Sequence, residues 1–127
     1  MAPSLCIFSG RFDPPHIGHV VTILRLKRQF PQVLVVVLDY PERRTPICLT
    51  VQVLAEVIQG KAKIVVNRTH FAKITQKELK KLSGGRPFVY AAGNLEVLLH
   101  VERLGAKTLY TDRAYPFSAR FIKMIKE

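Results

Sequence analysis

Residues 8–19, Phe-Ser-Gly-Arg-Phe-Asp-Pro-Pro-His-Ile-Gly-His, constrain the fold of this chain more than any other stretch. The apolar run from Leu5 to Phe8 predicts a buried parallel strand. Ser9 and Gly10 are expected to release the chain from strand geometry, and two prolines then form a rigid corner. Apolar residues at helical spacing predict a helix from about His16 to Gln29. The sequence therefore joins a strand to a helix through a tight turn.

The first turn of this helix carries two histidines, His16 and His19. Residues three apart are neighbours on a helix, and Gly18 between them lets a ligand come close to the backbone. The unpaired N–H groups of a helix N-terminus favour an anion. We therefore expect a phosphate site in which the histidines need only donate hydrogen bonds, with neither acting as a general base. The alternative is a capping histidine beside an ordinary surface histidine.

The pattern GxFDPxHxGH is present in full from Gly10 to His19. It resembles the signature of the nucleotidyltransferase superfamily that includes nicotinate and nicotinamide mononucleotide adenylyltransferases, phosphopantetheine adenylyltransferase, and the glycerol-phosphate and choline-phosphate cytidylyltransferases. The resemblance implies transfer of a nucleoside monophosphate, AMP from ATP in the first instance, to a small phosphorylated acceptor with release of pyrophosphate. It implies Mg²⁺ on the triphosphate, catalytic roles for the two histidines, and nucleotide contacts from Ser9, Gly10, Arg11, Phe12 and Gly18. No carboxylate cluster marks a dedicated metal site.

The rest of the chain alternates strand and helix patterns with short loops. Strands are predicted over 5–8, 33–38, 62–66, 87–91 and 107–110, and helices over 16–29, 50–60, 75–82, 93–104 and within 111–126. Thr50 is the expected cap of the second helix, and Thr75 with Glu78 forms the capping box of the third. This order predicts a single Rossmann-like α/β domain with a five-stranded parallel sheet, helices on both faces and right-handed crossovers.

The first and fourth strands should flank the point where the strand order reverses, and ligands of open parallel sheets bind there. That position would place the histidine turn beside Gly93 and Asn94, which we assign to nucleotide binding, although the Asp of the family's Gly-x-Asp element is missing. Arg43 and Arg44 follow a central strand and are candidates for holding a substrate phosphate. A charged, solvent-exposed turn explains these two arginines equally well.

Residues 113–123 resemble the closing motif of the same superfamily in part. The resemblance implies nucleotide contacts from Arg113, Ser118 and Arg120 and a catalytic role for Lys123. Ala119 and Arg120 replace hydroxyl residues of the motif, which leaves open a nucleotide-binding or regulatory protein with lost or reduced turnover. From the residues alone, Ser118 is a helix N-cap followed by a basic helix face.

The charge balance favours an anionic partner, because 20 Lys and Arg face nine Asp and Glu and give a net charge of +11. Eight of the basic residues lie between Lys61 and Arg86 with one acid, Glu78. This run fits a solvated face or the surface of a basic nucleic-acid-binding module. No nucleic-acid motif or interleaved aromatic residue accompanies it, so nucleic acid is not the partner we favour.

The longest apolar run, Val33 to Leu38, is too short to span a membrane, and no signal-peptide pattern is present. Cys6 is predicted to be a small, buried apolar residue, and neither cysteine has the spacing of a metal ligand. A cytoplasmic protein without a membrane partner is expected. Members of the superfamily commonly form oligomers, so the resemblance also implies a homo-oligomer.

Overall fold

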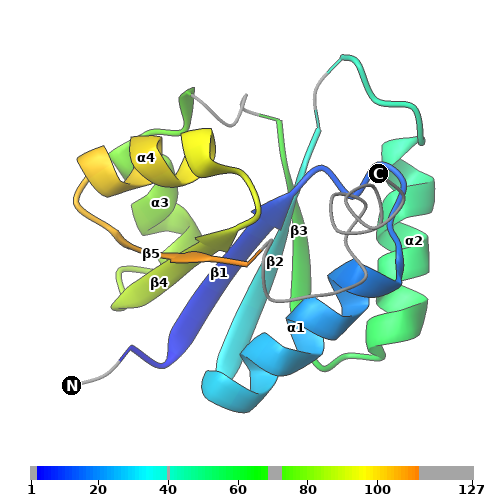
Figure 1. The fold of residues 1–127 in the computed structure, drawn as a ribbon, viewed down its shortest axis with the longest axis horizontal. Coiled ribbons are helices and arrows are strands. Elements are labelled where there is room, and N and C mark those ends of the chain that lie inside the picture. The colour runs from blue at the N-terminus through cyan, green and yellow to red at the C-terminus, as the bar shows by residue number, and fades with distance from the viewer. Residues whose placement is uncertain (1–2, 40, 69–72, 112–127) are drawn as a thin grey trace, which may run out of the picture.

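A computed structural model describes residues 3–39, 41–68 and 73–111 of the chain (Figure 1). Strands and helices alternate along this part of the sequence. They are β1 (Leu5–Gly10), α1 (Ile17–Gln29), β2 (Gln32–Leu38), α2 (Ile47–Ile58), β3 (Lys63–Asn67), α3 (Gln76–Ser83), β4 (Phe88–Ala92), α4 (Leu95–Arg103) and β5 (Lys107–Tyr110). The predicted Rossmann-like fold is confirmed. The helix expected within 111–126 lies beyond Thr111 and outside the described residues.

The five strands form one parallel sheet in the order β3-β2-β1-β4-β5. The central strand β1 pairs with β2 from Leu5 opposite Gln32 to Gly10 opposite Val37. On its other side it pairs with β4, where Phe8 lies opposite Ala91. The chain builds outward from β1 to β3 and then crosses back to β4. The strand order therefore reverses between β1 and β4, as the sequence predicts.

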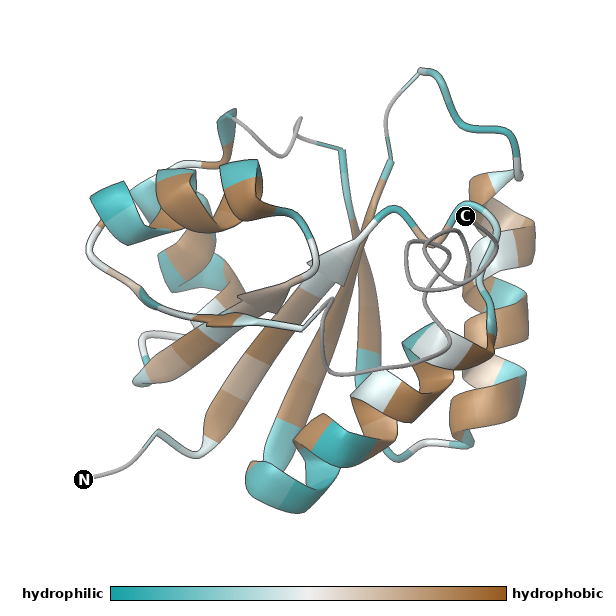
Figure 2. Cartoon of the chain, viewed as in Figure 1, coloured by the Kyte–Doolittle hydropathy of each residue, from teal (hydrophilic) through white to brown (hydrophobic). Residues whose placement is uncertain are grey.

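Helices cover both faces of the sheet (Figure 1). On one face Cys6 and Phe8 of β1 pack with residues of α1 and α2, and on the other Leu5 and Ile7 pack with residues of α3 and α4. Burial on both faces explains why β2 is a continuous apolar run without polar alternation. Figure 2 shows the same feature as hydrophobic colour along the central strands.

Two local expectations are wrong. Strand β1 does not end at Phe8 but continues through Ser9 and Gly10, because both residues pair with β2. Helix α2 begins at Ile47, and Thr50 lies fully buried within it instead of capping it. Pro46 occupies the N-cap position of α2 and makes no side-chain capping bond. The Thr50 hydroxyl instead accepts a hydrogen bond from Arg43 in the preceding loop and donates one to the Phe12 carbonyl, which lies far away in sequence.

Other local expectations are confirmed. Thr75 and Glu78 form the capping box of α3, and Cys6 is buried. None of the helices in the described ranges has the length and apolar content that a membrane crossing requires.

Candidate functional site

The turn after β1 is shaped by Phe12. Its backbone lies in the left-handed region with φ +49°, and its ring is only 1% exposed. A Cβ atom on Gly10 would lie 3.2 Å from the Cζ atom of this ring, so the glycine leaves room for it. The ring packs edge-on against His19 with 4.7 Å between centroids. Phe12 is thus placed at the predicted site, but its side chain supports a histidine and is covered from any ligand.

His16 and His19 cap helix α1 together. The Nδ1 atom of His16 accepts a hydrogen bond from the Gly18 N–H at 3.0 Å, and the Nδ1 atom of His19 accepts one from the His16 N–H at 3.1 Å. This is a reciprocal capping box in which imidazoles take the roles usually held by a hydroxyl and a carboxylate. The two rings stack with 3.7 Å between centroids. Capping thus fixes the orientation of both rings.

The hydrogen bonds also determine where the ring protons lie. Because each Nδ1 is an acceptor, the neutral form of each ring carries its proton on Nε2. Burial lowers the pKa of His16. Burial, together with the nearby His16, lowers the pKa of His19 to about 3. At neutral pH the start of α1 therefore presents two uncharged rings, each with an Nε2–H donor.

The backbone contributes less to an anion site here than the sequence alone predicts. The N–H groups of His16 and Gly18 donate to the imidazoles, and the His19 N–H donates to the His16 carbonyl at 3.0 Å. These three groups already have acceptors. An anion at this helix start would meet the imidazole N–H groups first.

A second loop, residues 41–46, is joined to the turn by Asp13. The carboxylate of Asp13 accepts hydrogen bonds from the backbone N–H groups of Arg44 at 2.7 Å and Thr45 at 2.6 Å. These bonds hold the pKa of Asp13 below its ordinary value. Asp13 therefore stays ionised and ties the histidine turn to the loop after β2.

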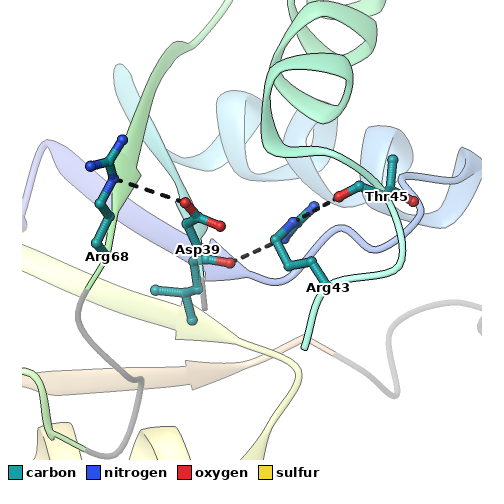
Figure 3. Close-up of polar contacts among 5 residues, drawn as sticks. Asp39, Arg43, Thr45 and Arg68 are labelled. Atoms are coloured by element: carbon teal, nitrogen blue, oxygen red, sulfur yellow. Dashed lines mark hydrogen bonds and ion pairs between the residues drawn. The ribbon is translucent and has the colours of Figure 1, made fainter. Parts of the chain in front are cut away.

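Arg43 makes the reciprocal connection. Its guanidinium donates to the carbonyls of Arg11 at 2.5 Å and Phe12 at 3.3 Å in the histidine turn. Its other bonds go to the carbonyls of Leu38 at 3.1 Å and Thr45 at 3.1 Å and to the Thr50 hydroxyl at 2.7 Å. Figure 3 shows the bond from Arg43 to the Thr45 carbonyl. We call the contacts of Asp13 and Arg43 the loop clamp.

Arg43 and Arg44, which the sequence predicts to have the same role, differ in their contacts with the loop clamp. All five N–H donors of Arg43 are engaged with the protein, so this residue positions the loops. The exposed side chain of Arg44 makes no hydrogen bond or ion pair with the described residues, so its donors face solvent. Sequence reasoning assigned no role to Asp13 and took Thr50 for a cap. The role of Asp13 could have been suspected from its position inside the motif, whereas no local sequence pattern indicates the role of Thr50.

A hollow of about 550 Å³ lies beside the clamp and is lined by Asp39, Arg43, Arg44, Thr45 and Arg68, among others. Arg68 points toward Asp39 across this hollow, with its Nε 3.9 Å from the carboxylate (Figure 3). The Arg68 side chain is 85% exposed, so the ion pair is weak and the cation can turn to a ligand. In the sequence, Arg68 is marked only as one of the basic residues between Lys61 and Arg86. Its position directly after β3 was the missed signal.

The β4 side of the site holds Gly93 and Asn94, both exposed and next to the histidine turn through the pairing of β1 with β4. The Asn94 side chain accepts a hydrogen bond from the Glu96 N–H at 2.8 Å and so caps α4. The Thr111 N–H donates to the Ala92 carbonyl at 3.1 Å, so the chain after β5 lies beside the carboxyl end of β4. Arg113, Ser118, Arg120 and Lys123 lie outside the described residues.

Ser9 lies at the end of β1 and is 2% exposed. Its hydroxyl makes no hydrogen bond to the described residues. Burial raises the pKa of Tyr90, on the adjacent strand β4, to about 12. Arg11, the remaining predicted contact, is exposed in the turn.

No group of three or more His, Cys, Asp or Glu side chains in ranges 3–39, 41–68 and 73–111 is arranged to hold a metal ion. The carboxylate nearest the histidines in sequence, Asp13, already accepts two backbone N–H groups. The donors described at this site are therefore N–H groups, which suit phosphate oxygens and not a cation.

Comparison with known proteins confirms the resemblance. The model of the cytidylyltransferase-like family matches residues 7–52, which include the histidine turn, α1 and the loop clamp. No curated protein matches the chain.

Two solved structures have the same fold. A bifunctional NMN adenylyltransferase/ADP ribose pyrophosphatase from Francisella tularensis, complexed with AMP and Mn ion, aligns with a TM-score of 0.68 and 14% identity over 87% of this chain. This chain spans only 37% of that protein. A putative nicotinate-nucleotide adenylyltransferase from Vibrio parahaemolyticus aligns with a TM-score of 0.57 and 16% identity over 97% of this chain and 86% of the other.

Proposed function

We propose that this chain is a nucleotidyltransferase that moves a nucleoside monophosphate from a nucleoside triphosphate to a small phosphorylated acceptor. The observation that carries the proposal is the stacked pair of His16 and His19 after β1, in which each Nδ1 accepts a backbone N–H at the start of α1. The family match over the same residues and the shared fold of two adenylyltransferases support it. ATP is the proposed donor, and CTP is the alternative that the family's description suggests.

The proposed reaction is an in-line displacement at phosphorus. An oxygen of the acceptor phosphate forms a bond to the α-phosphorus, and the bond from that phosphorus to the bridging oxygen of the β-phosphate breaks. Pyrophosphate leaves with the electron pair of that bond. Such transfers depend mainly on positioning and on positive groups around the phosphorus. The protein needs no covalent intermediate.

The histidines would act as hydrogen-bond donors to the triphosphate. Their Nε2–H groups are fixed by the capping box before any ligand arrives, so donation costs little reorganisation in the transition state. A neutral donor also releases the product anion more easily than a fixed cation does. Neither ring serves as a general base, because the group that accepts hydrogen bonds on each ring, Nδ1, is turned toward the backbone.

The remaining nucleotide contacts are proposed by position. Gly10, Arg11 and Gly18 lie in the histidine turn, Ser9 lies beneath it, and Gly93 and Asn94 lie across from it on β4. Arg113, Ser118 and Arg120, which lie outside the described residues, are proposed to bind the nucleotide, and Lys123 is proposed to be catalytic. Mg²⁺ would enter as part of the nucleotide substrate, held by its phosphate oxygens.

The acceptor phosphate is proposed to bind in the hollow beside the loop clamp. Arg44 and Arg68 are the two cations there whose side chains are exposed. Arg43, first expected to bind substrate, would instead hold Arg44 in place through its bonds to the loop. Both a cytoplasmic location and self-association remain predictions.

A second candidate function is nucleotide binding without turnover. It is favoured by Ala119 and Arg120, which replace two hydroxyl residues of the closing motif. Loss of those hydroxyls removes hydrogen bonds to the triphosphate, although Arg120 could form charge-assisted bonds in their place.

Pyrophosphate release tests the proposal. The assay would pair ATP, CTP, GTP or UTP, with Mg²⁺, with nicotinate mononucleotide, nicotinamide mononucleotide, phosphopantetheine, glycerol phosphate or choline phosphate. Release with one pair, lost in His19→Gln, would establish the transfer and name its substrates. Calorimetric binding of a nucleotide without any release would favour the second candidate, and absence of both would contradict each of them.

A further inference from the structure

A second hollow lies beside the edge strand β3. It has a volume of about 710 Å³ and is lined by residues from the starts of β1 and β2, from most of β3 and the segment before it, and from α1 and α3. The hollow extends along β3 as far as Asn67, which pairs with Leu38 at the carboxyl end of β2. It shares no lining residue with the hollow beside the loop clamp. We call this hollow the β3 groove.

The rim of the β3 groove is strongly basic. Lys27, Lys61, Lys63, Lys81 and Arg86 line it, and Glu78 is the only acid among the lining residues. Two of these cations are held by the protein: Lys27 donates to the Pro31 carbonyl at 2.5 Å, and Arg86 donates to the Ser83 carbonyl at 3.1 Å and to the Gln32 side chain. Several basic residues of the run between Lys61 and Arg86 therefore line the β3 groove.

The other three cations are available to a ligand. Lys61, Lys63 and Lys81 are exposed, and none has an ion-pair partner within the described ranges. Like charges gathered in this way repel one another in the free protein. An anionic ligand would relieve that repulsion.

The floor and the outer side of the groove are apolar and strand-like. Leu34, Val65 and Leu82 line it, together with Val66, which is 42% exposed. Val65 and Val66 are consecutive in β3, so their side chains point to opposite faces and the groove reaches the strand's edge. Among the described residues no strand pairs with that edge. Unpaired strand edges bind extended polypeptide through backbone hydrogen bonds.

We propose that the β3 groove binds an acidic polypeptide segment in extended conformation. The segment pairs with the outer edge of β3, sets apolar side chains against Val65 and Val66, and places carboxylates beside Lys61, Lys63 and Lys81. The charge of the rim selects acidic sequences, and the strand edge selects extended ones. This surface shares no lining residue with the hollow beside the loop clamp, and its occupation does not depend on turnover there.

Two other occupants fit the groove less well. Single-stranded nucleic acid is bound largely by stacking its bases on aromatic side chains, and no aromatic residue lines this groove. A second copy of the chain carries its own net charge of +11, which opposes close approach to a basic rim. An acidic polypeptide satisfies both the charge and the strand edge.

The test is a binding titration with a fluorescein-labelled peptide of alternating Glu and Val. The groove variant is Lys63→Glu with Lys81→Glu, and the matched control is Lys77→Glu with Lys80→Glu, which makes the same charge change in the same region outside the groove. We expect binding to weaken about tenfold or more in the groove variant, because two favourable charge contacts become repulsive, and by less than about twofold in the control. Should the groove variant unfold, Lys63→Gln with Lys81→Gln replaces it.

Two further arms identify the occupant. A peptide with N-methyl groups on alternate backbone nitrogens should bind about tenfold more weakly, since it cannot complete the strand pairing. A thymidine oligonucleotide of equal length should bind more weakly than the peptide. The proposal is overturned if the acidic peptide does not bind, if the control variant weakens binding as much as the groove variant, if N-methylation has no effect, or if the oligonucleotide binds more tightly.

Discussion

At the scale of single residues, the same two imidazoles shape the helix start and present its donors. The Nδ1 atoms of His16 and His19 accept backbone N–H groups, which leaves Nε2–H as the donor of each ring. Phe12 supports the pair from below, and Gly10 makes room for Phe12. The chemistry of the site therefore depends on a local structural device.

Replacing His19 separates the structural role from the catalytic one. Glutamine at this third helical position can still accept the His16 N–H, as in an ordinary capping box, whereas alanine cannot. We expect His19→Ala to lower the free energy of unfolding by about 1 kcal/mol and His19→Gln by clearly less. Both should reduce pyrophosphate release about 100-fold or more. Denaturant unfolding and the release assay measure the two effects; equal activity in wild type and His19→Gln would remove the histidine from the mechanism.

The lowered pKa of His19 has a consequence for stability. The unfolded chain binds a proton to this ring below its ordinary pKa of about 6.5, whereas the folded chain resists protonation down to about 3. The contribution of His19 to stability is therefore complete above about pH 6.5 and is lost as the pH falls toward 3. Urea unfolding at pH 7, 6 and 5 should show a smaller loss for His19→Gln than for wild type. Parallel curves for the two proteins would contradict the lowered pKa.

At the scale of elements, the loop clamp joins the turn after β1 to the loop after β2. Asp13 satisfies backbone N–H groups of that loop, and Arg43 satisfies backbone carbonyls of the turn. Each segment thereby orders the other. The hollow proposed for the acceptor borders the clamp directly, so its shape depends on the clamp.

The two arginines of this loop should respond differently to the same substitution. Lysine cannot reproduce the five bonds of Arg43, so Arg43→Lys should lower the free energy of unfolding by about 2 kcal/mol. Arg44→Lys should change it by less than about 0.5 kcal/mol, because the Arg44 side chain is exposed, and should raise the KM for the acceptor. Thermal unfolding and steady-state kinetics measure these effects. Equal destabilisation by both substitutions would show that the clamp does not hold in solution.

At the scale of the whole molecule, the hollow beside the loop clamp and the β3 groove share no lining residue. Sites that share no side chain are expected to act largely independently. The Glu and Val peptide should therefore leave nucleotide affinity unchanged within about twofold, and the groove variant should release pyrophosphate at the wild-type rate. Calorimetry of each ligand with and without the other measures the coupling. A larger mutual effect would join the two surfaces in one mechanism.

The fold could be predicted because its signals are local. The continuous apolar run of β2 indicates burial on both faces, and the motif from Gly10 to His19 predicts the turn and the start of the helix directly. The clamp could not be predicted, because Asp13 and Arg43 meet their partners only once β1 and β2 are paired. The error at Thr50 has a related cause, since its hydroxyl bonds to Arg43 and to the distant Phe12 carbonyl and not to the helix start.

The most direct test of the central claim is a ¹⁵N NMR measurement of the imidazole nitrogens at pH 7, with and without a nonhydrolysable ATP analogue and Mg²⁺. Substitution of His16 and His19 in turn by Gln assigns their signals among those of the four histidines. We expect both rings to be neutral with the proton on Nε2, and the analogue to shift the Nε2 resonances. Charged rings, protons on Nδ1, or Nε2 resonances that do not respond to the analogue would contradict the central claim.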